Sequence, residues 1–252
     1  MSRDSSADQP KYLRIAAELR AALERGEYVA GDRLPGENTL AADFGVASLT
    51  MRQALGLLRG EGLVGSRKGS GWFVESFRPI RRRGIPRLAR EQWGSSKTIW
   101  SADDNRAPDV DQVTVAEEVT PPEHIADVLD LAQDGTVCVR NRRYSVEGRP
   151  VMLSASYLPQ TLVTGSAITE ANPGPGGIYA RLADLGHAPA RFREEIRVRM
   201  PSGEEASRLS IPADRSIIKV ARTAFDAGGR AVEVNEMTMD SAAYVLDYEF
   251  DA

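Results

Sequence analysis

The stretch that decides the fold of the first part of the chain is residues 10–74, PKYLRIAAELRAALERGEYVAGDRLPGENTLAADFGVASLTMRQALGLLRGEGLVGSRKGSGWFV. Apolar residues recur at helical spacing from Lys11 to about Arg25, which predicts one amphipathic helix. A tight turn at Pro35-Gly36 follows, and then come two short helices over about residues 37–44 and 48–60. Two short helices joined by a turn of a few residues are a helix-turn-helix arrangement.

Each of the three predicted helices has one apolar face. The inward residues are Tyr12, Ile15, Ala16, Leu19 and Leu23, then Leu40, Ala41 and Phe44, then Met51, Ala54, Leu55 and Leu58. Gly45 fits the left-handed position that ends a helix, because glycine has no Cβ to strain there. Ser48 or Thr50 is expected to cap the third helix.

A glycine-rich hairpin completes the stretch. Leu63-Val64 and Trp72-Phe73-Val74 flank the basic segment of residues 65–71, whose glycines allow a close approach to a phosphate or a minor groove. A helix-turn-helix beside a basic hairpin is a device for binding duplex DNA, with the second helix in the major groove.

At this point the sequence resembles a family. Residues 10–74 look like the winged helix-turn-helix of the GntR family of bacterial transcription regulators. The matching residues are Tyr12, Ile15-Ala16, Gly31 to Pro35, Leu40-Ala41, Phe44 to Val46, Thr50 to Arg52, Ala54-Leu55, Glu61 to Val64 and Gly71 to Val74. Two arginines that the family uses on DNA are replaced by Asn38 and Ser48, and neither replacement can fork onto guanine as arginine does.

The pattern and the resemblance together predict the DNA contacts. Phosphates are assigned to Lys11, Arg33 and Lys68, and base edges to Asn38, Ser48, Thr50 and Arg52. The wing, comprising Arg67, Lys68, Gly69, Ser70 and Gly71, is expected to lie along a groove. The altered positions mean that the operator sequence of relatives does not carry over.

Composition and charge separate the chain into two parts. Its 252 residues are enough for two domains, and 42% hydrophobic with 27% charged residues is typical of globular proteins. Residues 1–90 contain 16 Lys and Arg against 10 Asp and Glu, whereas residues 91–252 contain 16 against 26. The acidic part would be repelled by phosphates, so we expect only the basic part to bind nucleic acid.

The same features bear on location. The apolar runs are too short to span a membrane, and the polar start has no secretory signal. The single cysteine, Cys138, excludes an internal disulfide, and its apolar neighbours predict burial. We therefore expect a cytoplasmic protein.

Four segments are predicted: a disordered lead-in over residues 1–9, the winged helix-turn-helix domain over 10–76, a linker over 77–112 and a second domain over 113–252. Within the linker, residues 88–93 are expected to form a turn or two of helix and residues 98–100 a short strand. Two interpretations of Arg81-Arg82-Arg83 stay open, a solvated linker or an arm on DNA phosphates.

The second domain alternates strands and helices. Strands are predicted around residues 113–115 and over 136–144, 151–157, 193–199, 217–226, 232–240 and 245–250, and helices over about 122–131, 178–185 and 203–209. Antiparallel hairpins separated by helices indicate an α+β fold with one mixed sheet.

This half resembles the UTRA effector-binding domain of the HutC subfamily of GntR regulators, a mixed α/β, chorismate-lyase-like fold. The residues that match are Arg142, Gly148 to Val151, Ser156 to Pro159, Ile178-Tyr179, Leu182, Glu195-Ile196, Ala206, Leu209, Asp226, Gly229-Arg230 and Val232-Glu233.

The resemblance implies an effector site, which we assign to Arg142, Tyr144, Ser154, Tyr179, Glu233 and Met239. Three of these depart from the pattern that UTRA domains use on phosphorylated sugars: Tyr144 replaces a basic residue, Ser154 a glutamate and Met239 an aromatic. A pocket with the cation of Arg142 and the carboxylate of Glu233 suits an effector with an anionic group and a hydroxyl or amine. The three departures make the site less polar, so we expect a ligand more apolar than a sugar phosphate. An alternative is that Arg142 and Glu233 are exposed strand charges or pair with each other.

Catalysis is not expected. Two histidines far apart and one cysteine do not favour a metal site, no nucleophile-elbow pattern is present, and the segment of residues 174–177 lacks the Lys-Ser/Thr of a phosphate loop. No catalytic residue, metal ligand or cofactor is assigned.

The sequence thus predicts a homodimeric transcription regulator, a repressor in our interpretation, that binds palindromic operator DNA and responds to a small molecule. One alternative is a constitutive DNA-binding protein whose second domain only dimerises. Another is a small-molecule enzyme with an accessory DNA-binding domain.

Overall fold

The computed structural model describes residues 9–67, 69–77, 79–93 and 107–250. The predicted lead-in, apart from its last residue, lies outside these ranges, as do Lys68 and the strand predicted over residues 98–100. The chain forms two compact units: Met1–Pro79 with two short segments, Pro212–Arg215 and Ser241–Ala243, and the remainder from Ile80 onward. Within the described ranges, no helix combines the length and apolar character needed to cross a lipid bilayer.

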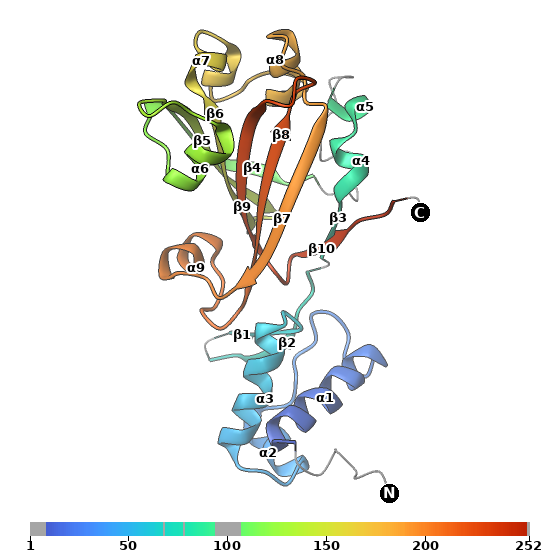
Figure 1. Cartoon of the computed structure of the whole chain (residues 1–252). Helices are drawn as coiled ribbons and strands as arrows, with labels where there is room; N and C mark the ends of the chain where they lie inside the picture. The colour runs from blue at the N-terminus through green and yellow to red at the C-terminus, as the bar shows by residue number, and fades with distance from the viewer. Residues whose placement is uncertain (1–8, 68, 78, 94–106, 251–252) are drawn as a thin grey trace, which may run out of the picture. The chain divides into compact units, whose positions relative to one another are not determined.

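The first unit contains three helices and a hairpin, as the sequence predicts (Figure 1). They are α1 (Lys11–Glu24), α2 (Glu37–Asp43), α3 (Ser48–Gly60), β1 (Val64–Arg67) and β2 (Gly71–Val74). The predicted apolar faces meet in one core, in which Met51, Leu55 and Leu58 are fully buried. The three-helix core carries the hairpin on its side, because Leu63, Val64 and Trp72 pack against it.

The turn between α2 and α3 follows glycine chemistry, but the expected cap does not form. Gly45 has φ +60°, and the amide of Val46 donates to the carbonyl of Ala41 at 2.9 Å, which ends α2 as predicted. The residue before α3 is Ala47, and no side chain caps the helix there. The prediction that Ser48 or Thr50 caps α3 is wrong, because both residues are already inside the helix.

The second unit is built on a six-stranded sheet in the order β4-β5-β6-β9-β8-β7. The strands are β4 (Asp109–Val119), β5 (Val137–Val146), β6 (Arg149–Pro159), β7 (Arg191–Arg199), β8 (Ile217–Phe225) and β9 (Ala231–Asp240). All five pairings are antiparallel, so the predicted α+β class is right but the main sheet is not mixed. Hairpins join β5 to β6 and β8 to β9, and a hairpin connection makes its two strands antiparallel. A longer connection over residues 200–216, which contains a helix, joins β7 to β8.

The hairpin between β5 and β6 is tighter than the four-residue turn predicted. Val146 pairs with Arg149, and the two residues between them, Glu147 and Gly148, have φ values of +52° and +76°. Positive φ at both central residues matches the right-handed twist of the strands. The turn and a register shift between Tyr144 and Ser145 together align Arg142 with Ser154.

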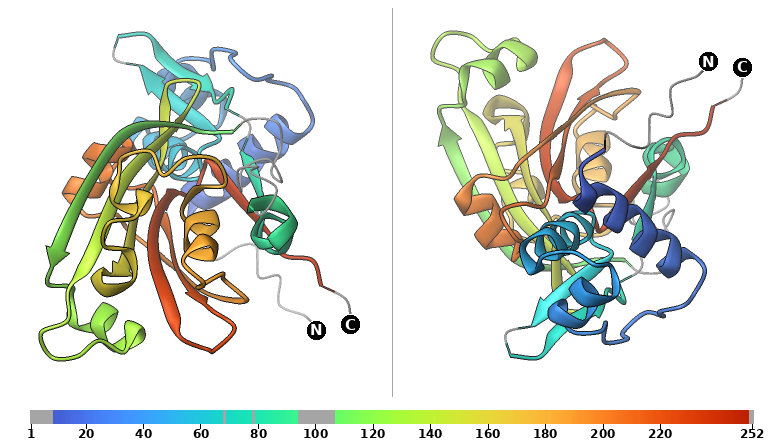
Figure 2. Two further views of the ribbon diagram at one scale, coloured as in Figure 1. Left: turned by 90° about the horizontal axis from the view of Figure 1, so that it is seen from above. Right: turned by 90° about the horizontal axis from the view of Figure 1, so that it is seen from below.

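Helices cover both faces of the sheet. They are α6 (Glu123–Leu129), α7 (Gln160–Val163), the 3-10 helix η2 (Ala167–Thr169), α8 (Gly177–Asp184) and α9 (Gly203–Leu209). Both views of Figure 2 show α8 and α9 on opposite sides of β8 and β9. The face under α8 buries Cys138, as predicted, together with Leu158 and Ala224. The opposite face is only partly covered, by α6 and α9.

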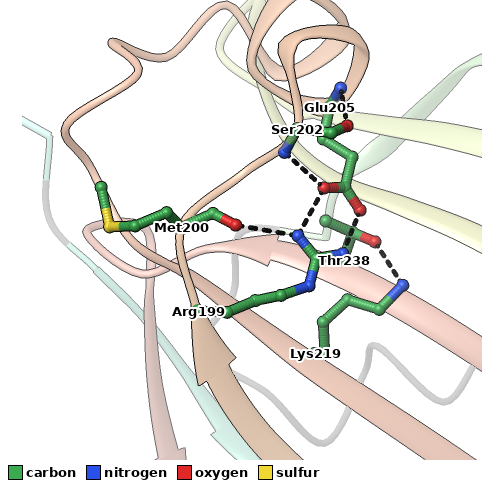
Figure 3. A network of polar contacts seen from close by, with 6 residues as sticks. All are labelled: Arg199, Met200, Ser202, Glu205, Lys219 and Thr238. Atoms are coloured by element: carbon green, nitrogen blue, oxygen red, sulfur yellow. Dashed lines mark hydrogen bonds and ion pairs between the residues drawn. The ribbon is translucent and has the colours of Figure 1, made fainter.

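Helix α9 is held to the sheet by a polar network (Figure 3). Ser202 and Glu205 form a capping box at its start, in which the Ser202 side chain accepts from the Glu205 amide. Glu205 also pairs with Arg199 at the end of β7, with both N–O distances at 2.7 Å. One carboxylate thus stabilises the helix start and ties it to a strand.

Much of the predicted linker belongs to the second unit. Strand β3 (Ile80–Arg83) pairs in parallel with β10 (Tyr244–Asp247), and α4 (Gly84–Leu88) and α5 (Arg90–Trp93) follow. Arg82 is fully buried, pairs with Glu194 through both carboxylate oxygens, and donates to the Tyr248 hydroxyl at 3.0 Å. The interpretation of the arginine triplet as a solvated linker is therefore wrong for Arg82, because strand alternation turns it inward between exposed Arg81 and Arg83.

Candidate DNA interface and effector pocket

The start of α3 is the exposed edge of the helix-turn-helix. Ser48 and Arg52 are exposed and Thr50 is half-buried, whereas Met51 and Leu55 point into the core. Leu49, which the sequence analysis did not select, is 65% exposed in the same turn. An apolar side chain there offers a contact for a thymine methyl group. In the sequence, Leu49 stands outside the set of apolar residues that the helical spacing turns toward the core.

Two polar contacts connect α2 to the start of α3. Ser48 Oγ donates to Asn38 Oδ1 at 3.1 Å, so the two residues that replace the family's arginines contact each other. Arg52 donates to the Glu37 carboxylate at 2.7 and 3.3 Å. The Glu37 carboxylate raises the pKa of the Arg52 guanidinium. These contacts orient Asn38, Ser48 and Arg52 in one exposed cluster.

The other predicted DNA-binding residues lie elsewhere on the first unit. Lys11 is exposed at the first residue of α1. Arg33 forms an isolated bridge with Phe73 of the wing, and its guanidinium lies 3.5 Å from where a Cβ on Gly71 would be. Gly69 and Ser70 are exposed at the hairpin tip, where Gly69 has φ +77°. The structure does not describe Lys68 or the side chain of Arg67.

The second unit contains a cavity of about 490 Å³ on the α8 face of its sheet. Its walls come from the start of β4, from β5, β8 and β9, from the loop of residues 171–177 and from the start of α8. Four of the six predicted effector residues border it: Arg142, Tyr144, Tyr179 and Glu233. The fold thus brings together residues that are up to 91 positions apart in the chain.

Ser154 and Met239 are not among the residues that line this cavity. Ser154 is buried and donates to Asn235 Oδ1 at 2.9 Å, so it contacts a residue that lines the cavity. Met239 is fully buried in the sheet. Arg142 borders the cavity directly, with its guanidinium carbon 6.0 Å from the centre of the Tyr144 ring.

Glu233 is the most buried charge of the site. It has no exposed surface, and neither carboxylate oxygen accepts a hydrogen bond of ordinary geometry. No ion pair joins it to Arg142 in the part of the chain that the structure describes, and Nε of Arg142 has no partner either. Both alternatives for these residues, exposed strand charges and a mutual pair, are therefore wrong for Glu233.

The Tyr179 hydroxyl belongs to the same buried cluster. Burial raises the pKa of Tyr179 well above its ordinary value, and the nearby Glu233 carboxylate adds to this, while Arg222 acts in the opposite direction. The phenol therefore remains a neutral hydrogen-bonding group at any physiological pH.

Among the polar strand residues that line the cavity, the sequence did not indicate Arg222 and Asn235. They lie directly opposite each other on β8 and β9. Arg222 is 2% exposed, and its Nε and Nη1 atoms have no hydrogen-bond partner. In the sequence, Arg222 is marked only by its position in the alternation of β8, where a charge stands among inward residues. Strand β7 also alternates charged and apolar residues, but its charges are largely exposed, so alternation alone does not identify a buried charge.

The loop of residues 171–177 is shaped by glycines and held by Arg140. Gly174, Gly176 and Gly177 all have positive φ, which supports the prediction of a loop there. Arg140 donates to the carbonyls of Ile168, Glu170 and Ala171, the last at 3.0 Å. Arg140 is therefore a structural arginine beside the site, two residues before Arg142 on the same strand.

Histidine chemistry is remote from the cavity. His124 contacts Glu236 at 3.2 Å and His187 contacts Asp226 at 3.0 Å, and none of these four residues lines it. Over the described ranges, no three His, Cys, Asp or Glu side chains gather in a way that could hold a metal ion.

Comparisons with known families and proteins agree with this architecture. The gntR family of bacterial regulatory proteins matches residues 11–74, and the UTRA domain matches residues 109–245. An HTH-type transcriptional regulator of Streptomyces coelicolor is 26% identical over 249 residues, covering 96% of this chain and 93% of the relative. The HTH-type transcriptional repressor NagR of Bacillus subtilis is 24% identical over 235 residues, covering 92% and 91%.

Solved structures show the same fold. The crystal structure of a GntR-family transcriptional regulator superposes with a TM-score of 0.64 at 24% identity, over 97% of this chain and 99% of that one. PhnF from Mycobacterium smegmatis superposes with a TM-score of 0.56 at 24% identity, over 94% and 99%. These relatives are transcription regulators, not enzymes. The chain therefore belongs to the GntR family of bacterial transcription regulators, in the UTRA-containing, HutC-like subfamily, with a DNA-binding winged helix-turn-helix and a UTRA effector domain.

Proposed function

We propose that this regulator is a homodimeric repressor that binds a palindromic operator and is released by a small anionic effector. The observation that carries the proposal is the cavity of about 490 Å³ lined by buried, unpartnered charges in the same chain as a DNA-binding unit. Repression is supported by the alignment with NagR, a repressor by name, over 92% of the chain. Binding to operator DNA places its action in the bacterial cytoplasm.

On the operator, the exposed cluster at the start of α3 contacts base edges. Asn38, Ser48, Thr50 and Arg52 supply donors and acceptors, and Lys11 and Arg33 supply phosphate contacts together with the wing from Arg67 to Ser70. Asn38 and Ser48 bind each other and Arg52 binds Glu37, so each of these contacts must open or be shared when DNA binds. Arg52 is 65% exposed and is the only arginine among the four proposed base contacts, so we assign to it the largest share of base recognition.

The dimer explains how a ligand in the second unit controls DNA binding. The two α3 helices of a dimer fit the two halves of a palindrome only at a set spacing, about one turn of the DNA double helix or a multiple of it. An effector that binds more tightly to one dimer geometry shifts the population toward it. We assign DNA binding to residues 10–76, and effector and dimer contacts to the second unit. This assignment extends the predicted range of 113–252 toward the N-terminus, because Pro108 and Val110 border the cavity.

The first experiment identifies the operator. DNA upstream of the chain's own gene is searched for palindromes, and the purified full chain is footprinted on them. A protected palindrome with two-fold symmetry, bound by a dimer in sedimentation analysis, supports the proposal. Binding as a monomer to an asymmetric site would contradict it.

The second experiment uses Arg142→Ala in metabolite-induced release from that operator. The variant should bind operator DNA as the wild type does, because Arg142 is not among the proposed DNA contacts. It should no longer release the operator when the effector is added, because Arg142 borders the effector cavity. Release at the wild-type effector concentration would place the effector elsewhere. Retention of the operator with every metabolite tested would instead indicate a constitutive DNA-binding protein.

A further inference from the structure

Two buried side chains of opposite charge line the effector cavity without satisfying each other. Among the described residues, Arg222 on β8 has no hydrogen-bond partner at its Nε and Nη1 atoms, and no cationic group binds the carboxylate of Glu233 on β9. The hydroxyl of Tyr179 lies close to that carboxylate, but a neutral phenol does not balance its charge. The exposed fractions of Arg222 and Glu233 are 2% and 0%. No ion pair between them occurs anywhere in the described ranges.

This arrangement does not favour the stability of the unit. A buried charge without a partner costs free energy, and a pair of buried charges is retained at low cost only when the two groups bind each other. The cavity is large enough for water and for a small ligand, so polar atoms that enter it can satisfy both side chains. The unused hydrogen-bonding capacity therefore points to a ligand.

The surroundings of Arg222 leave it available to that ligand. Glu194, its cross-strand neighbour on β7, is already occupied by Arg82 and by the Tyr248 hydroxyl. On the other side, the side-chain oxygen of Asn235 accepts from Ser154. The Tyr179 ring lies 5.5 Å from the guanidinium carbon and holds it by a cation–π contact. Arg222 is thus positioned by neighbours that do not use up its donors.

We infer that the effector is a dipolar molecule, whose anionic group binds Arg222 and whose amine or other cationic N–H group binds Glu233. This inference rests on the proposed function, which needs only an anionic effector. Arginine binds carboxylate or phosphate through paired N–H donors, and a carboxylate only accepts hydrogen bonds. A cationic N–H group both donates to Glu233 and balances its charge, whereas an anion without such a group leaves that charge unbalanced.

The rest of the wall sets the character of the ligand's body. Val110, Val113 and the Tyr144 ring border the cavity beside Arg142. An apolar or aromatic skeleton fits these groups, and Arg142 offers a second cation to the anionic end. The class that results is that of amino acids and amino-substituted organic acids, not simple anions or neutral sugars.

Matched compounds test the class. Three sets share a skeleton within each set: 4-aminobutyrate, butyrate and butylamine; L-phenylalanine, 3-phenylpropanoate and 2-phenylethylamine; 4-(aminomethyl)benzoate, 4-methylbenzoate and 4-methylbenzylamine. Binding to the full chain is measured by calorimetry and by the rise in melting temperature. In at least one set the dipolar compound should bind about 10- to 100-fold more tightly than either truncated partner, the loss expected when a buried charge is left without its partner.

Variants then assign each end. Glu233→Gln, which keeps the shape of the side chain, should lower the affinity for the dipolar compound to that for the matched acid. Arg222→Met should lower the affinity for the dipolar compound to that for the matched amine. Controls are Glu236→Gln and Arg197→Met, which alter side chains on the opposite face of the same sheet and should change neither affinity. Melting of the unliganded variants establishes that each one folds.

The outcomes separate this inference from the proposed function. If the acids bind as tightly as the dipolar compounds, if Glu233→Gln leaves their order unchanged, or if no compound of any set binds, the dipolar class is wrong. Operator affinity is measured on the same samples by fluorescence anisotropy. Intact operator binding with a failed ligand test leaves the DNA-binding function standing, and lost operator binding contradicts the proposed function itself.

Discussion

Replacing Arg82 with methionine should destabilise the second unit by about 3–5 kcal/mol, the cost of removing one partner from a buried ion pair. Only 1% of the Arg82 side chain and 7% of the Glu194 side chain are exposed. Arg82 donates to both oxygens of Glu194, and the Tyr248 hydroxyl donates to the same carboxylate at 2.5 Å. Without Arg82, the carboxylate stays buried with the phenol as its remaining close partner.

The destabilisation should depend on pH in a definite direction. In the wild type burial favours the neutral acid, but the Arg82 guanidinium outweighs it and lowers the pKa of Glu194. In the variant burial dominates and raises that pKa above the unfolded value. A group whose folded pKa is raised stabilises the fold below the unfolded pKa and loses this effect as pH rises through the folded value. The difference in the free energy of unfolding between variant and wild type should therefore become smaller as the pH falls.

The assay is urea denaturation followed by circular dichroism, from about pH 8 down to about pH 5. Arg81→Met is the matched control, because Arg81 lies next in the same strand but is exposed, with its Asp247 pair also accessible, and should cost no more than about 1 kcal/mol. Arg82→Met combined with Glu194→Met should recover much of the loss, since no charge is then left buried alone. Equal losses for Arg81→Met and Arg82→Met, or a loss that does not change with pH, would refute the reasoning.

Three further predictions follow from single contacts. The Arg199 guanidinium is the main cause that lowers the pKa of Glu205 to about 2 (Figure 3). The stability that this carboxylate contributes is therefore present above pH 4.5 and is lost as the pH falls from 4.5 toward 2. In acid titrations of stability, Glu205→Gln should lack this loss, whereas Glu204→Gln on the same helix should keep it. Gly84→Ala places a Cβ 2.2 Å from Cε1 of Tyr248 and should lower the free energy of unfolding by about 1–3 kcal/mol. Gly203→Ala, whose Cβ meets no atom within 4 Å, should leave it unchanged, and equal melting temperatures of the two variants would contradict this prediction. Arg52→Ala should weaken operator binding about tenfold or more in anisotropy titrations, with Arg25→Ala, another exposed and paired arginine of this unit, as the unaffected control; unchanged affinity would remove Arg52 from the interface.

Local features of the chain were sufficient to predict the three helices and the hairpin of the first unit. The apolar periodicity of α1 and α3, the glycine at position 45 and the glycine-rich hairpin each act over a few residues, so the sequence reports them directly. The same holds for the β8–β9 turn at residues 228–230. The sequence also indicated Arg142 and Glu233, but only through the resemblance to UTRA domains, because nothing local distinguishes them from ordinary strand charges.

Tertiary structure alone decided which charges are buried and which residues meet. Arg82 follows Arg81 in an apparently solvated run, and only the pairing of β3 with β10 and the presence of Glu194 turn it into a buried partner. Arg222 enters the cavity because β8 lies between β7 and β9, an order that hydrophobic alternation does not encode. The physical reason is that alternation along a strand specifies two faces, whereas strand order depends on contacts between residues far apart in the chain.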